Sequence, residues 1–240
     1  MGSSILNLLY PENLYCICCG DTIPKNRFHS LCDKCIEKIN WISDNPYAPS
    51  MDEFAFDDLK ACCIYGYYPR LIIGKFKDGE RYIAKPVAHI MSERLYKPSI
   101  NEDGEITDDD EKKYDVIVFI PSTKEKLSAR GYNQAKLLAD EVSKNTHIPV
   151  LDALIKTKNT ASMRKASMTE RQTMLAGSFD IKKDHEEKIK NKNVVLIDDV
   201  VTTGSTVNEV SKLLRNSGAS SITVLAFACG TNISNYDPAI

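Results

Sequence analysis

The feature that most constrains the fold is a run of thirteen residues near the C-terminus, 194–206, which reads VVLIDDVVTTGST. Its first four residues are apolar, as is typical of a strand buried on both faces in a parallel sheet. Two adjacent aspartates, Asp198 and Asp199, follow this apolar run. After two more valines, a turn rich in hydroxyl groups leads into a helical pattern at 207–214. The order predicts a strand, an acidic pair, a turn and a helix.

This order of elements favours a binding site for a ribose phosphate. The free N–H groups of the turn and the dipole of the following helix both attract an anion. Gly204 lets the backbone approach a ligand closely, and the hydroxyl groups add donors. The two carboxylates come at the end of the strand, where open α/β sheets bind ligands, and can accept bonds from sugar hydroxyls or hold Mg²⁺. The candidate ligand residues beyond the aspartates are Val200, Thr202, Thr203, Gly204, Ser205 and Thr206.

Residues 194–206 resemble, over their whole length, the phosphoribosyl-pyrophosphate (PRPP) signature of type I phosphoribosyltransferases. The alternative interpretation is an ordinary buried strand followed by a capped helix. That interpretation leaves two adjacent carboxylates at the end of a buried strand without a role, which is energetically costly. We therefore expect PRPP to bind here.

Composition and charge exclude several other classes of protein. The chain has 240 residues and a formal net charge of −2, so it lacks the basic field of a nucleic-acid coat protein. No segment approaches the ~18 apolar residues of a membrane span, and the N-terminus lacks the basic region of a signal peptide. We expect a cytoplasmic protein. In that compartment, eight cysteines favour a metal site or free thiols over disulfides.

Two C-x-x-C pairs predict a structural zinc site near the N-terminus. Cys16 and Cys19 form the first pair, and Cys32 and Cys35 form the second, with twelve residues between the pairs. Two such turns can complete a closed tetrahedral site, which would fold a segment too small to hold its own core. Redox-active or free cysteines are the alternative. Cys18 could replace a neighbouring ligand or remain a spare thiol.

A Pro- and Ser-rich run between residues 45 and 58 is predicted to be a linker. It divides the chain into a zinc-binding knuckle at 10–45 and a phosphoribosyltransferase-like domain at 58–232. In the second domain, further strands are predicted at 62–68, 114–120 and 221–229, and helical patterns at 80–95 and 133–143. This alternation predicts an α/β fold, a parallel sheet flanked by helices, with a ligand cleft at the carboxyl ends of the strands.

Two basic segments are candidates for contact with pyrophosphate. A predicted loop at 123–132 carries Arg130, whose guanidinium can grip a phosphate in bidentate fashion. Lys75 and Lys77 flank an aromatic residue just before a turn. We expect Lys75 to lie near pyrophosphate oxygens, with a solvated basic turn as the alternative.

Taken in order, the cysteine knuckle, the KFK sequence at 75–77, a strand ending at Pro121, the sequence RGYNQAKLLA at 130–139 and residues 194–206 resemble the ComF family. This family includes ComFC- and GntX-type amidophosphoribosyltransferase-like proteins, and the resemblance extends from about Cys16 to Cys229. It implies a type I phosphoribosyltransferase fold and PRPP binding with Mg²⁺. It also implies a cytoplasmic role with single-stranded DNA or the DNA-uptake machinery in natural transformation.

The chain departs from the family pattern in its middle. The family often shows K-x-T-x-x-Q-x-x-L-x-x-x-x-R-x-x-N before a phenylalanine. Thr160 and Arg171 keep this pattern, whereas Met163 and Met174 stand in place of its polar amides. Because amides are suited to reading the edge of a base, the acceptor side of the site is altered in this chain.

These assignments predict which site residues bind each part of PRPP. The turn holds the 5′-phosphate, Asp198 and Asp199 hold the ribose hydroxyls, and Mg²⁺ bridges ribose and pyrophosphate oxygens. Arg130, with Lys75, stabilises the leaving pyrophosphate, so that catalysis consists of positioning and electrostatics. No residue stands out as the general base, and nothing names the acceptor. Two hypotheses remain: Mg-dependent transfer of a pentosyl group to an unknown acceptor, or a non-catalytic PRPP-sensing or single-stranded-DNA-binding competence module.

Overall fold

The computed structural model of the chain describes residues 14–25, 27, 29–42, 54–96, 99–100, 106–107, 114–157 and 177–230. The family-pattern positions Thr160, Met163, Arg171 and Met174 lie outside these ranges, as does most of the predicted linker.

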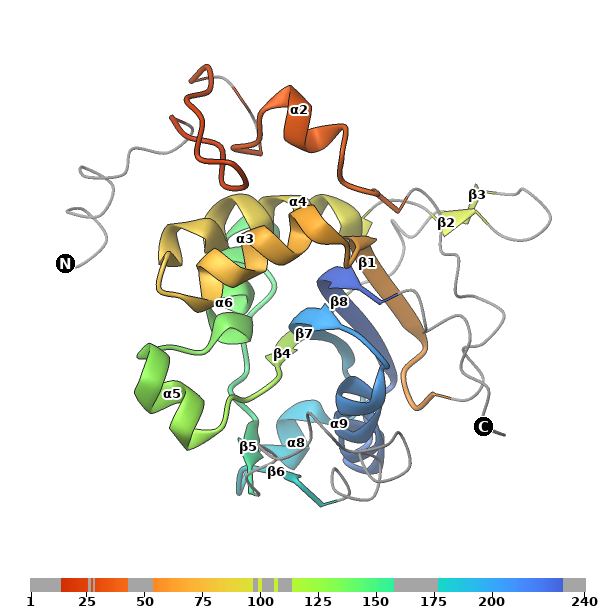
Figure 1. Cartoon of the computed structure of the whole chain (residues 1–240). Helices are drawn as coiled ribbons and strands as arrows, with labels where there is room; N and C mark the ends of the chain where they lie inside the picture. The colour runs from red at the N-terminus through yellow and green to blue at the C-terminus, as the bar shows by residue number, and fades with distance from the viewer. Residues whose placement is uncertain are drawn as a thin grey trace, which may run out of the picture.

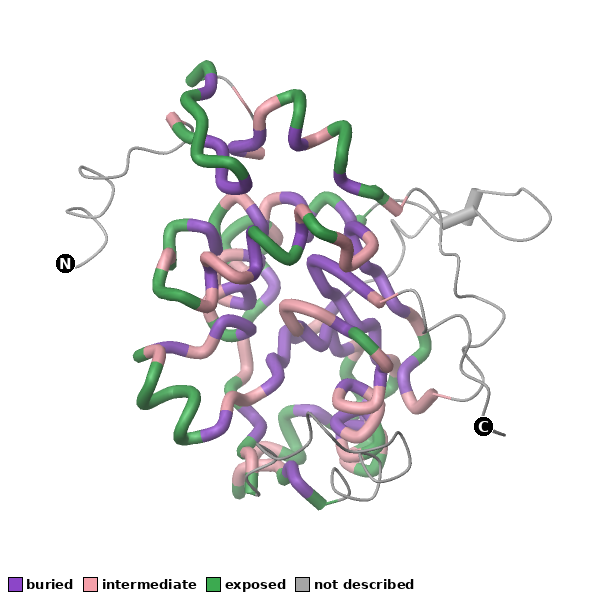
Figure 2. Tube along the Cα trace, in the orientation of Figure 1, coloured by how far each residue is buried: buried purple, intermediate pink, exposed green. Residues whose placement is uncertain are grey.

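Four parallel strands form the central sheet, in the order β1-β8-β7-β4 (Figure 1). Their bounds are Asp58–Ile64 for β1, Val116–Phe119 for β4, Asn193–Val201 for β7 and Ser221–Cys229 for β8. The apolar runs of the two central strands are buried, as expected for a parallel sheet with both faces covered (Figure 2). The predicted parallel α/β fold is confirmed.

Helices cover both faces of this sheet (Figure 1). Helices α4 (Ala84–Tyr96) and α6 (Gln134–Thr146) pack against each other and against the strands. Helix α9 (Ser205–Asn216) packs on β7 and β8, and its buried residues Val207, Val210 and Leu214 recur at helical spacing. Helix α3 (Tyr67–Lys77) follows β1 and is joined to α4 by the short 3₁₀ helix η2 (Arg81–Ile83).

The structure corrects two local predictions. The predicted strand at 62–68 begins earlier, at Asp58, and ends at Ile64, because Gly66 is the N-cap of α3. The predicted basic loop at 123–132 contains helix α5 (Lys124–Arg130), none of whose residues is buried. Hydrophobic periodicity could not predict helix α5, because this helix has no apolar face. Thr123 caps it by accepting a bond from the N–H of Lys126, and Gly131 ends it with a φ of 75°.

Two further segments contain short regular elements. Strands β2 (Ser99–Ile100) and β3 (Ile106–Thr107) form an antiparallel pair in the segment between α4 and β4. Strand β6 (Phe179–Ile181) pairs with β5 (Leu154–Lys156), and helix α8 (Glu186–Ile189) follows β6. Elements of two to four residues carry too little periodicity to be read from sequence.

The N-terminal cysteines form a small module, residues 14–42, that includes helix α2 (Asp33–Ile36) and lies above α3 and α4 in Figure 1. Its last residues pair with the edge of β1. The N–H of Ile42 donates to the carbonyl of Cys62 at 3.0 Å, and the N–H of Ile64 donates to the carbonyl of Asn40 at 2.9 Å. The module is therefore attached to the sheet as well as to the helices.

Among the helices in the described ranges, none combines the length and the hydropathy needed to cross a bilayer.

Candidate functional site

The acidic pair stands near the carboxyl end of β7, in the position predicted from the sequence. The side chain of Asp198 accepts a bond from the N–H of Asp199 at 2.9 Å, and that of Asp199 accepts one from the N–H of Val200 at 3.0 Å. Both carboxylates are thus held by the backbone that carries them. Asp198 also lines an open hollow of about 220 Å³ together with Val200 and the seven residues from Val201 to Val207.

Crowding by protein raises the pKa of Asp198 well above its usual range. The main cause is loss of hydration, and the neighbouring charge of Asp199 adds to it. Asp198 nevertheless keeps partial contact with solvent at the hollow, so a ligand can reach it. A carboxylate in this setting favours the approach of a cation.

The hydroxyl-rich turn after β7 has the form of an anion site. Gly204 adopts a left-handed conformation, with a φ of 75°, and is the N-cap of α9. No side chain caps this helix, so its first N–H groups stay available to a ligand. The hydroxyls of Thr203 and Ser205 lie 3.0 Å apart, beside these N–H groups.

Two glycines allow close contacts that hold the turn in place. A Cβ atom added to Gly204 would lie 2.9 Å from Cε1 of Phe54, and one added to Gly230 would lie 2.6 Å from the carbonyl oxygen of Thr202. Phe54 itself stacks on Phe56, with ring centroids 4.8 Å apart. The turn is therefore packed between the chain before β1 and the chain after β8, and both positions require glycine.

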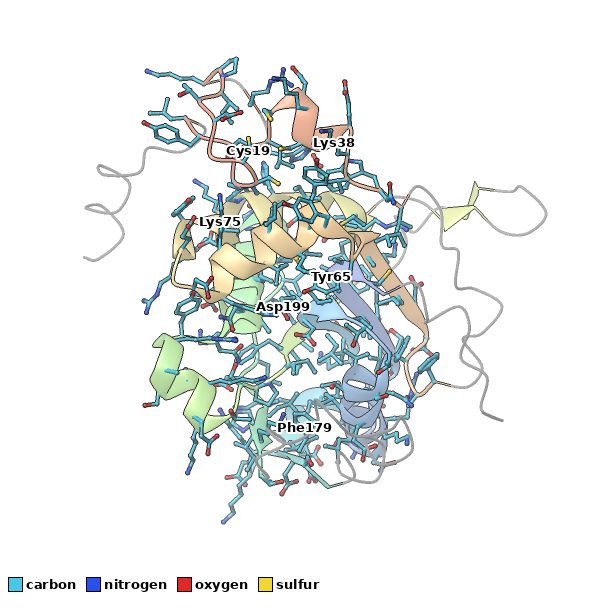
Figure 3. The ribbon with its side chains drawn as sticks, in the orientation of Figure 1. Cys19, Lys38, Tyr65, Lys75, Phe179 and Asp199 are labelled. Atoms are coloured by element: carbon cyan, nitrogen blue, oxygen red, sulfur yellow. The ribbon has the colours of Figure 1, made fainter. Side chains whose placement is uncertain are left out.

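A lysine of α3 reaches the acidic pair, but it is Lys77 and not Lys75. The Nζ atom of Lys77 lies 2.7 Å from Oδ2 of Asp199. Lys75 acts instead on the cysteine module, where its charge lowers the pKa of Cys18, although burial raises that pKa overall. Figure 3 shows Lys75 on the side of α3 that faces this module, with Asp199 beneath the helix.

Further cations gather around the acidic pair from separate elements. Lys126 of α5 loses hydration and interacts with Arg130 and Lys77, and these effects lower its pKa despite the two aspartates. Burial and the charge of Lys126 likewise lower the pKa of Lys156 of β5, while the charge of Asp198 opposes this shift. We call Lys77, Lys126, Arg130 and Lys156 the basic cluster. Positive charges gathered around one site favour the binding of an anion there.

The conspicuous sequence RGYNQ is largely structural in the fold. Gly131 ends α5, and Asn133 caps α6 and donates to the carbonyl of Ile120 at 2.9 Å. The hydroxyl of Tyr132 donates to the carbonyl of Phe76 at the end of α3. Arg130 donates to Oε1 of Gln134 at 3.2 Å, which holds its guanidinium on the side of the basic cluster. These contacts fix α3, α5 and α6 relative to β4.

The four predicted cysteine ligands meet in the N-terminal module. The Sγ atoms of Cys16, Cys19, Cys32 and Cys35 all lie within 4.8 Å of one another, and those of Cys19 and Cys32 are 3.7 Å apart. Tetrahedral zinc with bonds of ~2.3 Å would place two sulfurs ~3.8 Å apart. The N–H of Cys32 also points at the sulfur of Cys16, at 3.4 Å. The cluster could hold a metal such as zinc.

The surroundings shift the pKa values of these thiols in different directions. Burial raises the pKa of Cys35 to about 12, and it raises that of Cys19 as well. Burial also acts on Cys16, but bonds from the backbone of Cys19, Cys32 and Cys18 lower its pKa to about 7. A divalent ion would supply the positive charge that several neighbouring thiolates need. Cys18 is buried and its thiol contacts the carbonyl of Tyr68 at 3.9 Å, so it joins the module to α3.

Comparison with known proteins finds similarity over parts of this chain. The phosphoribosyl transferase domain family matches residues 127–237. Competence protein F of Haemophilus influenzae is 38% identical over 115 residues, covering 48% of this chain and 50% of that protein. The DNA utilization protein YhgH of Escherichia coli K12 is 34% identical over 111 residues, 46% of this chain and 47% of that protein. Competence protein ComFC of Bacillus subtilis is 36% identical over 106 residues, covering 44% of this chain and 40% of that protein.

These relatives and the phosphoribosyl transferase domain support the resemblance to the ComF family. The chain matches these curated relatives over about half of their length or less. The parallel sheet with flanking helices, the phosphoribosyl transferase domain and the N-terminal four-cysteine cluster agree with the family resemblance seen in the sequence.

The donor atoms at the acidic pair suit Mg²⁺. They are hard carboxylate oxygens, which Mg²⁺ prefers, and they stand beside a turn able to hold a phosphate. The ammonium group of Lys77 already occupies a cation's place at Asp199. Asp198 and Asp199 would therefore hold the ion, directly or through water.

Sequence reasoning missed some residues of the site. Lys77 and Lys126 were visible only as members of basic segments, and nothing local distinguished them or Lys156 from solvated lysines. Phe54 precedes β1 by four residues and gave no signal, because its role depends on contact with Gly204, far along the chain.

Proposed function

We propose that this chain is a member of the ComF family and binds PRPP with Mg²⁺ at the carboxyl end of β7. The observation that carries the proposal is the order of charge along one edge of the sheet. An uncapped helix start lies at the turn 202–206, an acidic pair follows in the middle, and the basic cluster lies beyond it. This order matches the phosphate, ribose and pyrophosphate of PRPP.

Each group of residues takes one part of the ligand in this proposal. The turn Thr202–Thr206 binds the 5′-phosphate through backbone N–H groups and hydroxyls. Asp198 and Asp199 accept bonds from the ribose hydroxyls. Arg130 and the lysines of the basic cluster bind pyrophosphate, so Lys77 takes the role that the sequence assigned to Lys75.

The same residues would promote transfer of phosphoribose to an acceptor. When bound, Mg²⁺, held by Asp198 and Asp199, would neutralise part of the negative charge of the ligand. The basic cluster stabilises the negative charge that grows on pyrophosphate as its bond to C1 lengthens. The turn, braced by Phe54 and Gly230, keeps the phosphate fixed while that bond breaks.

We further propose a role in handling DNA during uptake, in the cytoplasm. The support comes from the relatives, whose names are competence proteins and a DNA utilization protein. Single-stranded DNA and the proteins of the uptake machinery are the proposed partners. We propose that the N-terminal knuckle, residues 10–45, holds one structural zinc, and that residues 58–232 form the phosphoribosyltransferase-like domain.

A second candidate is a PRPP-sensing module that does not turn over. The methionines Met163 and Met174, which replace the polar amides of the family pattern, favour it, because a thioether cannot read the edge of a base as an amide does.

Calorimetry with PRPP and Mg²⁺ tests the binding site. We expect the double variant Asp198→Asn/Asp199→Asn to lose binding, and Asp140→Asn, which alters an exposed carboxylate of α6, to keep it. Equal affinity in wild type and the double variant would overturn the site assignment. Pyrophosphate release with a panel of nitrogen acceptors then separates the two functions. Release above a no-acceptor control supports the enzyme, and its absence supports the sensing module.

A further inference from the structure

Helix α5 carries two members of the basic cluster but buries none of its own residues. It lies at the margin of the molecule (Figure 1), and Leu127, an apolar residue of this helix, leaves 45% of its surface exposed. A helix without an apolar face in the core takes its position largely from its two ends. Thr123 caps the first end, and Gly131, with a left-handed backbone, closes the second. The contacts at Gly131 therefore bear directly on the position of its neighbour, Arg130.

Arg81 of η2 makes these contacts from a separate element. Its guanidinium donates to the carbonyl of Gly131 at 3.3 Å and lies 4.5 Å from the ring centroid of Tyr132. A Cβ atom added to Gly131 would lie 3.1 Å from Nη2 of Arg81, so this side chain packs directly on the backbone of the turn. A guanidinium over an aromatic face gains both electrostatic attraction and planar stacking. Arg81 thus contacts both residues that follow α5.

Tyr132, the ring beneath Arg81, is itself fixed in the core. It is buried, its ring centroid lies 6.0 Å from that of Phe76, and its hydroxyl donates to the carbonyl of Phe76. Burial raises the pKa of the Tyr132 hydroxyl, and the charges of Arg81 and Arg130 oppose that shift. The two arginines therefore both act on one buried ring, which links η2 and α5 to the end of α3.

We propose that Arg81 is a positioning residue for the pyrophosphate part of the site: by holding Gly131 and Tyr132, it directs Arg130 toward the acidic pair. Arg130 also donates to Oε1 of Gln134 at 3.2 Å, which supports its guanidinium from α6. A guanidinium held in this way can present two parallel N–H groups to one phosphate. The inference rests on the PRPP binding proposed above, and it adds to that site a residue of η2.

Calorimetry on the full chain tests the two halves of the site separately, with inorganic pyrophosphate and Mg²⁺ and with ribose 5-phosphate. We expect Arg81→Met to weaken pyrophosphate binding about fivefold. Ribose 5-phosphate should bind within about twofold of wild type, because it lacks the group that Arg130 binds. A double-mutant cycle with Arg130→Met separates positioning from the charge of Arg81 itself. If Arg81 acts through Arg130, Arg81→Met should cost less than about twofold in the Arg130→Met background.

A matched control and a second measurement separate positioning from general effects of charge. Lys85→Met removes an exposed cation of α4, four residues after Arg81, and should bind pyrophosphate as wild type does. In the ligand-free chain, hydrogen exchange at 127–131 should rise in Arg81→Met and stay at the wild-type level in Lys85→Met.

Three results would each overturn the inference. They are unchanged exchange at 127–131 in Arg81→Met, equal weakening of the two ligands by this variant, and full additivity of Arg81→Met with Arg130→Met. If the wild type binds no pyrophosphate, the proposed PRPP site fails together with this inference. If the wild type binds pyrophosphate and Arg81→Met binds it equally well, this inference alone fails.

Discussion

The ammonium group of Lys77 lies 2.7 Å from the carboxylate of Asp199, and the two residues come from the end of α3 and the end of β7. The carboxylate is largely shielded, with 14% of its side chain exposed, so the lysine is its charge partner in the absence of a ligand. A metal ion at the acidic pair would compete with this lysine. If Mg²⁺ and PRPP bind as proposed, the lysine would become available to the pyrophosphate.

This competition predicts how Mg²⁺ alone affects the variant Lys77→Met. Removing the ammonium leaves two close carboxylates without their cation, so Mg²⁺ should stabilise the variant more than the wild type. Thermal unfolding with and without Mg²⁺ measures the difference, which we expect to be a few degrees. Lys136→Met, which breaks the exposed pair with Asp140, serves as the control. Equal Mg²⁺ shifts in Lys77→Met and wild type would contradict the prediction.

Asp198→Asn is expected to stabilise the ligand-free protein at neutral pH. Burial and Asp199 raise the pKa of Asp198, so the folded state binds more protons than the unfolded state at pH values above the unfolded pKa of ~3.9. The contribution of Asp198 to stability therefore falls as the pH rises through this window. Asparagine does not titrate, so the variant lacks this loss of stability with rising pH. Urea unfolding at pH 4 and pH 7, without Mg²⁺ or PRPP, should show a smaller decline in the variant; an identical decline would argue against the raised pKa.

Gly204→Ala is expected to destabilise the chain by ~1–3 kcal/mol and to abolish PRPP binding. The new Cβ would lie 2.9 Å from the ring of Phe54, in a left-handed conformation that alanine disfavours. Denaturant unfolding and calorimetry measure the two effects. Gly20→Ala is a control for the conformation alone, because Gly20 has a φ of 83° but nothing within 4 Å of its Cβ position. If the steric contact matters, adding Phe54→Leu to Gly204→Ala should recover part of the stability, and no recovery would count against it.

Metal analysis of purified protein should find about one zinc per chain, and Cys32→Ser should lose it. Loss of one ligand from a closed four-thiolate site removes most of the affinity. Cys18→Ser should keep the zinc, because Cys18 lies outside the cluster of four sulfurs. Finding no zinc in the wild type would disprove the site, and loss of zinc in Cys18→Ser would assign Cys18 as a ligand.

Tyr132→Phe should cost ~1 kcal/mol, because the carbonyl of Phe76 loses its hydrogen bond in a buried position. The same change should loosen α3 where it positions Lys77. Denaturant unfolding gives the stability, and hydrogen exchange gives the opening of α3. Tyr15→Phe, on an exposed ring of the cysteine module, should leave both unchanged. Unchanged exchange in α3 of Tyr132→Phe would show that this bond does not hold the helix.

Features encoded by contiguous residues were predictable from the sequence by itself. The run Val194–Ile197 is apolar without interruption, which specifies a strand buried on both faces, and the structure has it as part of β7. The turn and helix that follow, and the two C-x-x-C pairs, are equally local, because the spacing of a few neighbours determines their geometry. The parallel α/β fold follows from the alternation of such segments.

Only the tertiary structure decided which cations serve the acidic pair. Lys75 and Lys77 are equivalent in a linear reading, but two residues of a helix differ in direction by about 200°, so one faces the cysteine module and the other faces Asp199. Lys126 of α5 and Lys156 of β5 influence each other although they belong to separate elements, and Phe54 meets Gly204, which lies far along the chain. Such contacts depend on how separate elements pack, which no local pattern encodes.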